Sequence, residues 1–243
     1  MEKIQIMLNS KKANRYINDK TTDCIFTLPQ IELKRRHRAY ISITNAIIPY
    51  SFYNVNETNN KISYILDDTI TYNIVIPPAN YNINTLIDAL KLLMTGFTIT
   101  YNSATNKLKI QHNSLSWEFI EPTTANEIIG LSDINIPFTD VYTFDSDIGI
   151  NLFTVRTLQI SSNNFIMNNI DTSQPNRASI ITSIPINVNM GSIIQYDNRH
   201  NIQSLIHDIT NINNLHIQIL DQDGDLLDLN GLHWSINLLL TIE

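Results

Sequence analysis

The chain has 243 residues, of which 43% are hydrophobic and only 16% are charged, and its formal net charge is −7. This length accommodates one large β domain or two small domains with a sizeable core. The acidic balance argues against a general nucleic-acid-binding protein, which needs a basic surface, so we expect no specific nucleic-acid partner. The single cysteine, Cys24, excludes an intrachain disulfide and is expected to be a small buried strand residue.

The polar content favours strands. Asn, Ser and Thr supply most of it, in place of the helix-forming Lys and Glu, and Ile and Thr are strand formers. No apolar run approaches 18 residues, so we expect no membrane span, and the apolar run near Met1 is too short for a signal peptide. We therefore predict a mainly all-β chain.

The first predicted elements are an arm and a short strand. Residues 1–22 are polar after a short alternation at Ile4, Ile6 and Leu8, and we expect an N-terminal arm that can donate one strand. A short strand over 24–28 then ends at Pro29, which cannot donate to a ladder.

A basic cluster follows at Lys34, Arg35, Arg36 and Arg38. Such a run can serve as a nucleic-acid patch, but a solvated loop between strands is the favoured interpretation. In an assembly, the same cluster is a candidate interface with an acidic neighbour. The next strand is predicted over 39–49, and the aromatic residues of 50–53 are expected to anchor its end on the core.

Residues 59–147 predict a compact α+β insertion lobe. Its expected elements are strands over 62–66, 69–76, 97–101, 107–111 and 116–120, a helix over 85–94 capped by Asn84 and stopped by Gly96, and a short helix that opens with a capping box over 124–127 and ends at Gly130. The remaining 23–58 and 148–243 are assigned to one jelly-roll domain, with the arm at 1–22 before it.

Strands return after the insertion lobe. They are predicted over 152–161, with Phe153 and Val155 facing inward, and over 180–188, 191–196 and 202–206. Short strands with regular turns and almost no helix are typical of a β-sandwich.

The chain closes with a predicted hairpin over 215–242. In its second strand Trp234, Ile236, Leu238 and Leu240 share one face, the period of two expected of a strand that is buried on one side. We therefore predict that these four residues form a core strand.

No catalytic constellation stands out. The acidic loop 221–225 lacks the spacing of an EF-hand and is flanked by strands, so a hairpin turn is favoured over a calcium site. No two histidines have the spacing of common zinc sites. We expect no catalytic residue, no metal and no cofactor, and hence no enzyme.

Four stretches together resemble the penton, or minor capsid, proteins of virophages and Polinton-like viruses. They are Met7-Leu-Asn-Ser-Lys, Ile48-Pro-Tyr-Ser-Phe-Tyr-Asn-Val-Asn, Ile76-Pro-Pro-Ala-Asn-Tyr and Asp228-Leu-Asn-Gly-Leu-His-Trp-Ser. The resemblance implies a single jelly roll of two four-stranded sheets with an insertion as a second, outward-facing lobe. It also implies a homopentamer that closes the five-fold vertices of an icosahedral capsid, with trimeric major capsid proteins as neighbours.

The resemblance places the protein in the virion, after assembly inside the host cell, and transfers no active site. Two alternatives stay open. One is a fibre-head or attachment protein that binds a host receptor or glycan, which is expected to be a trimer. The other is a jelly-roll enzyme such as a cupin, which would show a histidine cluster.

Overall fold

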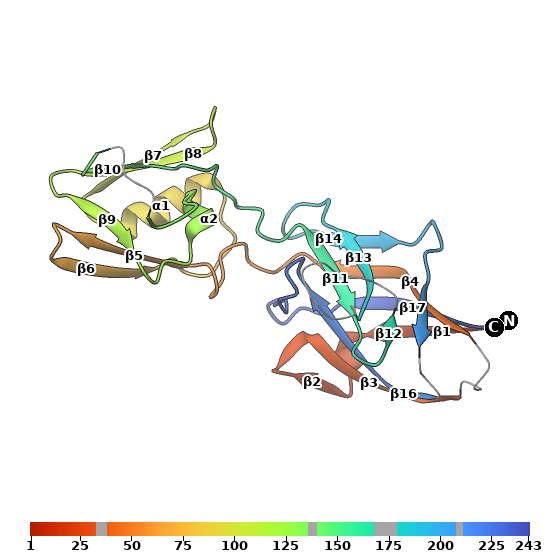
Figure 1. The fold of residues 1–243 in the computed structure, drawn as a ribbon. Coiled ribbons are helices and arrows are strands. Elements are labelled where there is room, and N and C mark those ends of the chain that lie inside the picture. Colours follow the sequence, from red (N-terminus) through yellow and green to blue (C-terminus); the bar gives the residue numbers. More distant parts are fainter. Residues whose placement is uncertain (33–37, 136–139, 168–178, 208–210) are drawn as a thin grey trace. The chain divides into compact units, whose positions relative to one another are not determined.

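The computed structural model describes residues 1–32, 38–135, 140–167, 179–207 and 211–243 (Figure 1). They divide into two units. The sandwich unit comprises Met1–Phe52 and Val155–Glu243, and the insertion unit comprises Tyr53–Thr154. The insertion unit thus begins before residue 59 and ends after residue 147, the borders expected from sequence. Asn54 accounts for the wider border, because its side-chain amide donates to the carbonyls of Tyr81 at 2.8 Å and Leu152 at 3.1 Å and so ties the entering and leaving segments together.

The sandwich unit contains two antiparallel sheets. The first consists of β1 (Glu2–Asn9), β17 (Ser235–Ile242), β4 (Ala39–Pro49), β15 (Ser204–His207) and β12 (Ile166–Met167) in that order, with β14 (Ile193–Asp197) beside the second half of β4. The second consists of β13 (Ile180–Pro185), β11 (Thr157–Ser161), β16 (Asn211–Leu220), β3 (Lys20–Glu32) and β2 (Arg15–Ile17). A 3-10 helix, η1 (Ser10–Lys12), follows β1.

The order of pairing defines a jelly roll. The first strand, β1, pairs with the last, β17, while β3 pairs with β16. Further in, β4 pairs with β14 and β15, and β11 pairs with β13. The chain therefore behaves like one long antiparallel hairpin rolled into two sheets, and the insertion unit occupies the connection from β4 to β11.

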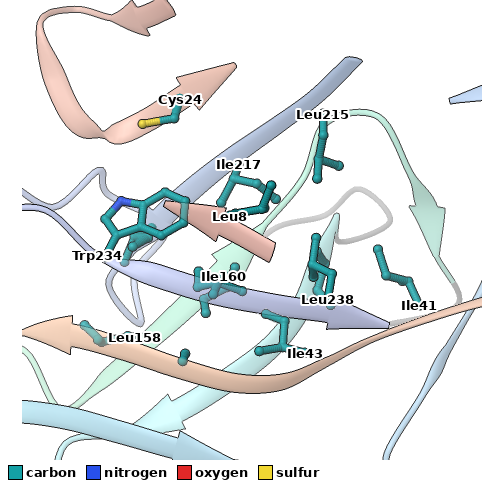
Figure 2. Packing of buried hydrophobic residues seen from close by; sticks show 14 of the residues in the cluster. Leu8, Cys24, Ile41, Ile43, Leu158, Ile160, Leu215, Ile217, Trp234 and Leu238 are labelled. Atoms are coloured by element: carbon teal, nitrogen blue, oxygen red, sulfur yellow. The ribbon is translucent and has the colours of Figure 1, made fainter. Parts of the chain in front are cut away.

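The core of the sandwich unit lies between these sheets (Figure 2). Alternate residues of each strand point inward, as the pleat requires. Ile41, Ile43 and Leu238 come from the first sheet, and Leu158, Ile160, Leu215 and Ile217 come from the second; all are at most 1% exposed. The mainly β jelly-roll fold predicted from the sequence is confirmed.

The N-terminal stretch predicted as an arm that can donate one strand forms a strand of the sandwich unit. Glu2–Asn9 pairs with β17 along its full length, from Glu2 opposite Ile242 to Asn9 opposite Ser235. The alternation of Ile4, Ile6 and Leu8 is sufficient to bury one face of this strand against the core, and Leu8 is 4% exposed. The following residues continue the sandwich as η1, β2 and the start of β3.

Two other expectations about strands are corrected. β3 continues past Pro29 to Glu32, because its pairing with β16 shifts register between Ile212 and Asn214 and gives the proline a place without a ladder partner. Phe153 does not face inward; it is 77% exposed, because β11 begins only at Thr157.

The insertion unit has its own sheets, helices and core. One sheet has the order β6 (Ile70–Val75), β5 (Lys61–Leu66), β9 (Trp117–Ile120), and the other has the order β10 (Thr143–Asp145), β8 (Lys107–His112), β7 (Phe97–Asn102). The helices are α1 (Ile83–Leu93) and α2 (Asn126–Ile129). Leu86 and Leu90 of α1 are fully buried in a cluster that includes Ile62, Ile99 and Ile110 from both sheets.

Both predicted helix starts are corrected. α1 begins after Asn82 and not after Asn84: the Asn82 side chain accepts from the N–H groups of Asn84 and Thr85, and Thr85 bonds back to complete a capping box. α2 has no side-chain cap, since Glu127 instead accepts from the Asn151 amide at 2.7 Å. Its predicted end is correct, because Gly130 adopts φ 75° at the C-cap.

Candidate assembly surface

The predicted core strand is β17 with the residue before it. Trp234, Ile236, Leu238 and Leu240 are at most 2% exposed. The Trp234 indole donates from Nε1 to the Thr21 carbonyl at 2.7 Å and packs edge-to-face on Phe26. Its backbone exchanges hydrogen bonds with Ser10, at 3.0 Å and 2.9 Å. These residues stabilise the sandwich and are not available to a partner.

Of the predicted basic patch, only Arg38 can be placed. Lys34, Arg35 and Arg36 lie outside the described residues. Arg38 is exposed, and its backbone pairs with that of Glu243 at 2.9 and 2.8 Å in both directions. The exposed guanidinium remains available to an acidic neighbour.

Three side chains of reactive types, Cys24, His112 and Asp221, have structural roles in the described part of the chain. Burial raises the pKa of Cys24 to about 12, so its thiol is protonated at neutral pH. His112 accepts at Nδ1 from the N–H groups of Ser114 and Leu115. Asp221 accepts from the N–H groups of Asp223 and Asp225, both at 2.9 Å, which makes the acidic loop a turn. Within the described ranges, no group of three or more His, Cys, Asp or Glu residues is placed to hold a metal ion.

One buried polar pair was not anticipated from the sequence. Asp23 of β3 and His216 of β16 lie on neighbouring strands and share a hydrogen bond between Oδ1 and Nε2. Their side chains are only 4% and 17% exposed, and Gln218 donates to the other Asp23 oxygen at 3.3 Å. The two residues are far apart in sequence, so only the register of β3 against β16 brings them together. The pair satisfies polar groups on the outer side of the second sheet.

A hollow of about 790 Å³ runs along β9 in the insertion unit. Four carboxylate residues line it, Asp68, Glu118, Glu121 and Asp140, beside the apolar Val141. This lining favours cationic groups over anionic ones. The acidic residues are dispersed in sequence, and no local motif marks them.

The outer side of the first sheet of the sandwich unit is almost uncharged. Its exposed apolar residues include Met7 at 77%, Ile47 at 40% and Ile193 at 53%. Between them lie uncharged polar side chains: Gln5 of β1, Asn237 of β17, Ser42 and Asn45 of β4, and Gln195 of β14. On this part of the sheet the charged residues are Lys3 on β1 and Asp197 on β14, at opposite margins. Such a surface can be buried against protein without the cost of desolvating charges.

Charge is divided unequally between the two units. The insertion unit holds 11 of the 23 acidic residues but only 4 of the 16 basic ones, so it carries the entire net charge of −7. The sandwich unit has 12 of each and is balanced. High net charge keeps a unit soluble and separate from its copies, whereas a balanced unit associates without net repulsion.

The fold defines this chain as a jelly-roll protein, a class that includes viral capsid and lectin domains. Among solved structures it is similar to the mavirus penton protein, with a TM-score of 0.56 and 11% identity over 100% of both chains. A second similar chain comes from the cryo-EM structure of the Sputnik virophage, with a TM-score of 0.41 and 13% identity over 97% of each chain. The likeness to the mavirus penton protein confirms the resemblance to virophage penton proteins at the level of the fold.

The remaining comparisons add nothing to this likeness: no protein-family model and no curated protein matches the sequence. Among the described helices, none is long and apolar enough to cross a membrane.

Proposed function

We propose that this protein is a minor capsid protein of the penton type, whose sandwich units form a pentamer at the five-fold vertices of an icosahedral capsid. The observation that carries the proposal is the fold likeness to the mavirus penton protein over the whole length of both chains, insertion included. The role is structural: the protein supplies a rigid two-sheet unit and surfaces for contact with its neighbours, which are further copies and the trimeric major capsid protein.

The division of charge supports this assignment. A subunit of a closed ring has to pack against copies of itself, and the balanced sandwich unit meets that requirement with its uncharged outer sheet side. The insertion unit, with all of the net charge, is suited to a solvent-exposed position outside the ring.

The attachment protein is the second candidate. The acidic hollow along β9 favours it, because recognition of a host surface needs a shaped site and the hollow lies in the insertion unit. The two functions differ in symmetry, since a fibre head is expected to be a trimer.

The rotational symmetry of the full-length protein tests the proposal. Mass photometry and negative-stain microscopy of the purified chain, alone and mixed with the major capsid protein, are expected to show five-fold particles. A three-fold particle would favour the attachment protein. A stable dimer under both conditions would contradict both assignments.

A further inference from the structure

The first sheet of the sandwich unit ends in a strand with an open edge at β1. The Ser10 N–H donates to the Trp234 carbonyl, in the same register as β1 against β17, so the even-numbered residues of β1 direct their backbone groups toward β17. The odd-numbered Lys3, Gln5 and Met7 therefore direct theirs away from the sheet. Among the described residues, no hydrogen bond to these outward backbone groups is present.

β14 presents a matching edge on the opposite side of the same sheet. Backbone bonds from Tyr50 to Ser192 and from Asn198 to Thr44 set the alternation, so Ile193, Gln195 and Asp197 direct their backbone groups away from β4. Within the described structure, only the Asp197 carbonyl on this edge is occupied, by the N–H of Arg199 at 2.9 Å. The side chains of these three residues are exposed on the same side of the sheet as those of Lys3, Gln5 and Met7.

The two edges are complementary in direction and in chemistry. β1 is antiparallel to β17, β17 to β4 and β4 to β14, so a β14 strand placed against the β1 edge of another copy runs antiparallel to it. In one register the facing pairs are Lys3 with Asp197, Gln5 with Gln195 and Met7 with Ile193. These pairs are opposite charges, two amides and two apolar side chains. A shift of this register by two residues in either direction separates Met7 from Ile193. Each of them then faces a polar residue or lies beyond the end of the facing strand.

Most other edges of the sandwich unit are less suited to pairing. β12 has two residues and β2 has three, and β2 carries a register shift between Tyr16 and Ile17. β13 ends in Pro185, and its pairing with β11 shifts between Ile160 and Ser161. Short strands, bulges and prolines are the devices by which proteins prevent edge pairing. β1 has eight residues, no proline and no register shift, and its outward Lys3 lies near one end of the strand, where the facing position in the register above is Asp197.

We propose that β1 of one copy pairs edge to edge with β14 of the next copy in the register that joins Gln5 to Gln195, so that the first sheet continues from subunit to subunit. This inference rests on the proposed penton function and names its subunit contact. Three facing pairs offer two backbone hydrogen bonds each, less the one lost to the occupied Asp197 carbonyl. Since the two edges differ, the contact is heterologous and builds a ring when its rotation closes.

Disulfide formation in the full-length chain tests the register. We would combine Gln5→Cys with Gln195→Cys and oxidise the protein under native conditions. Within one subunit these positions are about 14 Å apart across the strands alone, because β17 and β4 lie between them, and they are further displaced along the strands, since Gln5 is level with Ser42 and Gln195 with Ile47. This is too far for a disulfide, so any bond joins two copies. The native Cys24 is fully buried and does not interfere. We expect a non-reducing ladder that ends at five chains, and none from the control pair Gln5→Cys with Gln30→Cys, which has an exposed position on the other sheet.

A proline variant tests the edge independently. Gln5→Pro removes an N–H that points away from β17, so the fold should tolerate it while the edge loses its central donor. We expect the variant to keep the circular-dichroism spectrum of the folded parent chain, because an edge position tolerates proline, and its pentamer to dissociate. The same loss is expected from Gln195→Pro.

The outcomes separate this contact from the proposed function. Pentamers that form no Gln5→Cys to Gln195→Cys disulfide and that survive Gln5→Pro would overturn the contact and leave the penton assignment intact. Disulfide-linked chains that do not close at five would support the contact and overturn the pentamer. Absence of both oligomers and disulfides would overturn both.

Discussion

At the scale of single residues, Trp234 illustrates how the jelly roll is closed. Its ring fills the core, its indole N–H reaches the start of β3 and its backbone pairs with Ser10 at the end of β1. A buried indole needs a partner for its N–H, and here the partner lies on the opposite sheet. The residue thus connects both sheets at the end where the acidic turn of β16 and β17 lies.

Two adjacent leucines of β17, Leu238 and Leu239, point to opposite sides of the sheet. Leu238 is 0% exposed, whereas Leu239 lies on the outer side and is half-buried. We expect Leu238→Ala to lower the free energy of unfolding by about 2–5 kcal/mol, because it removes buried methyl groups and leaves a cavity. Leu239→Ala, the matched control, should cost much less. Urea unfolding followed by circular dichroism measures both, and equal losses would contradict the assigned faces.

Asp221 offers a prediction for pH. Burial raises its pKa above the ordinary aspartate value, although the N–H groups of Asp225 and Asp223 act in the opposite direction. A folded-state pKa above the unfolded value means that the folded chain binds the proton more readily, so this residue's contribution to stability falls as pH rises through its folded pKa.

Asp221→Asn retains an oxygen that can accept both N–H groups but carries no charge. We therefore expect the variant to be at least as stable as the parent at pH 7, and the difference to shrink as the pH is lowered toward 4. Melting curves across this range provide the measurement. A variant that is less stable at pH 7 and recovers nothing in acid would refute the prediction.

At the scale of elements, the turn between β5 and β6 places two aspartates in a backbone conformation that favours glycine. Asp67 and Asp68 have φ of 48° and 53°, and the N–H of Thr69 donates to the Leu66 carbonyl at 3.0 Å. Two central residues with positive φ define a type I′ turn, in which Gly is preferred at the second position.

Asp68→Gly is therefore expected to stabilise the insertion unit by up to about 1 kcal/mol, because glycine adopts positive φ without strain. Asp88→Gly provides the control: Asp88 is exposed within α1, where glycine is the poorer helix former, and the same substitution should destabilise. Thermal unfolding of the two variants should shift in opposite directions. Shifts of the same sign would contradict the role of backbone conformation.

At the scale of the whole molecule, two cores and two charge balances coexist in one chain. The insertion unit has its own buried cluster, and its ends are joined by the bond from Thr154 Oγ1 to the Asn54 carbonyl at 3.0 Å. Its net charge of −7 opposes contact between copies of this unit.

Residues 53–154, expressed alone, are therefore expected to fold and to remain monomeric. Near-ultraviolet circular dichroism reports the packing of Trp117, which is 4% exposed among Phe97 and Phe119, and sedimentation reports the mass. An unfolded fragment, or one that forms oligomers, would show that the unit depends on the rest of the chain.

Local patterns in the sequence determined the elements and the faces they bury. The alternation in β17 predicted its buried side, and Gly130 predicted the end of α2. Two errors have local causes. Asn82 and Asn84 are equally good caps, so only the formed helix selects one. Pro29 was expected to end a strand, but β3 continues to Glu32 because the register shift leaves this proline without a ladder partner.

Only the tertiary structure decided which strands lie together and which edges stay open. Alternation specifies the face of a strand but not its partner, because every half-buried strand has the same period of two. The pairing of Asp23 with His216, the hollow along β9 and the opposite open edges of β1 and β14 all arise from register between segments that are distant in the chain. By itself the sequence determined a β chain with a core strand at its end, since burial of alternate apolar residues is a local property. The assembly surface depends on topology, which is set by pairing between distant segments and is not a local property.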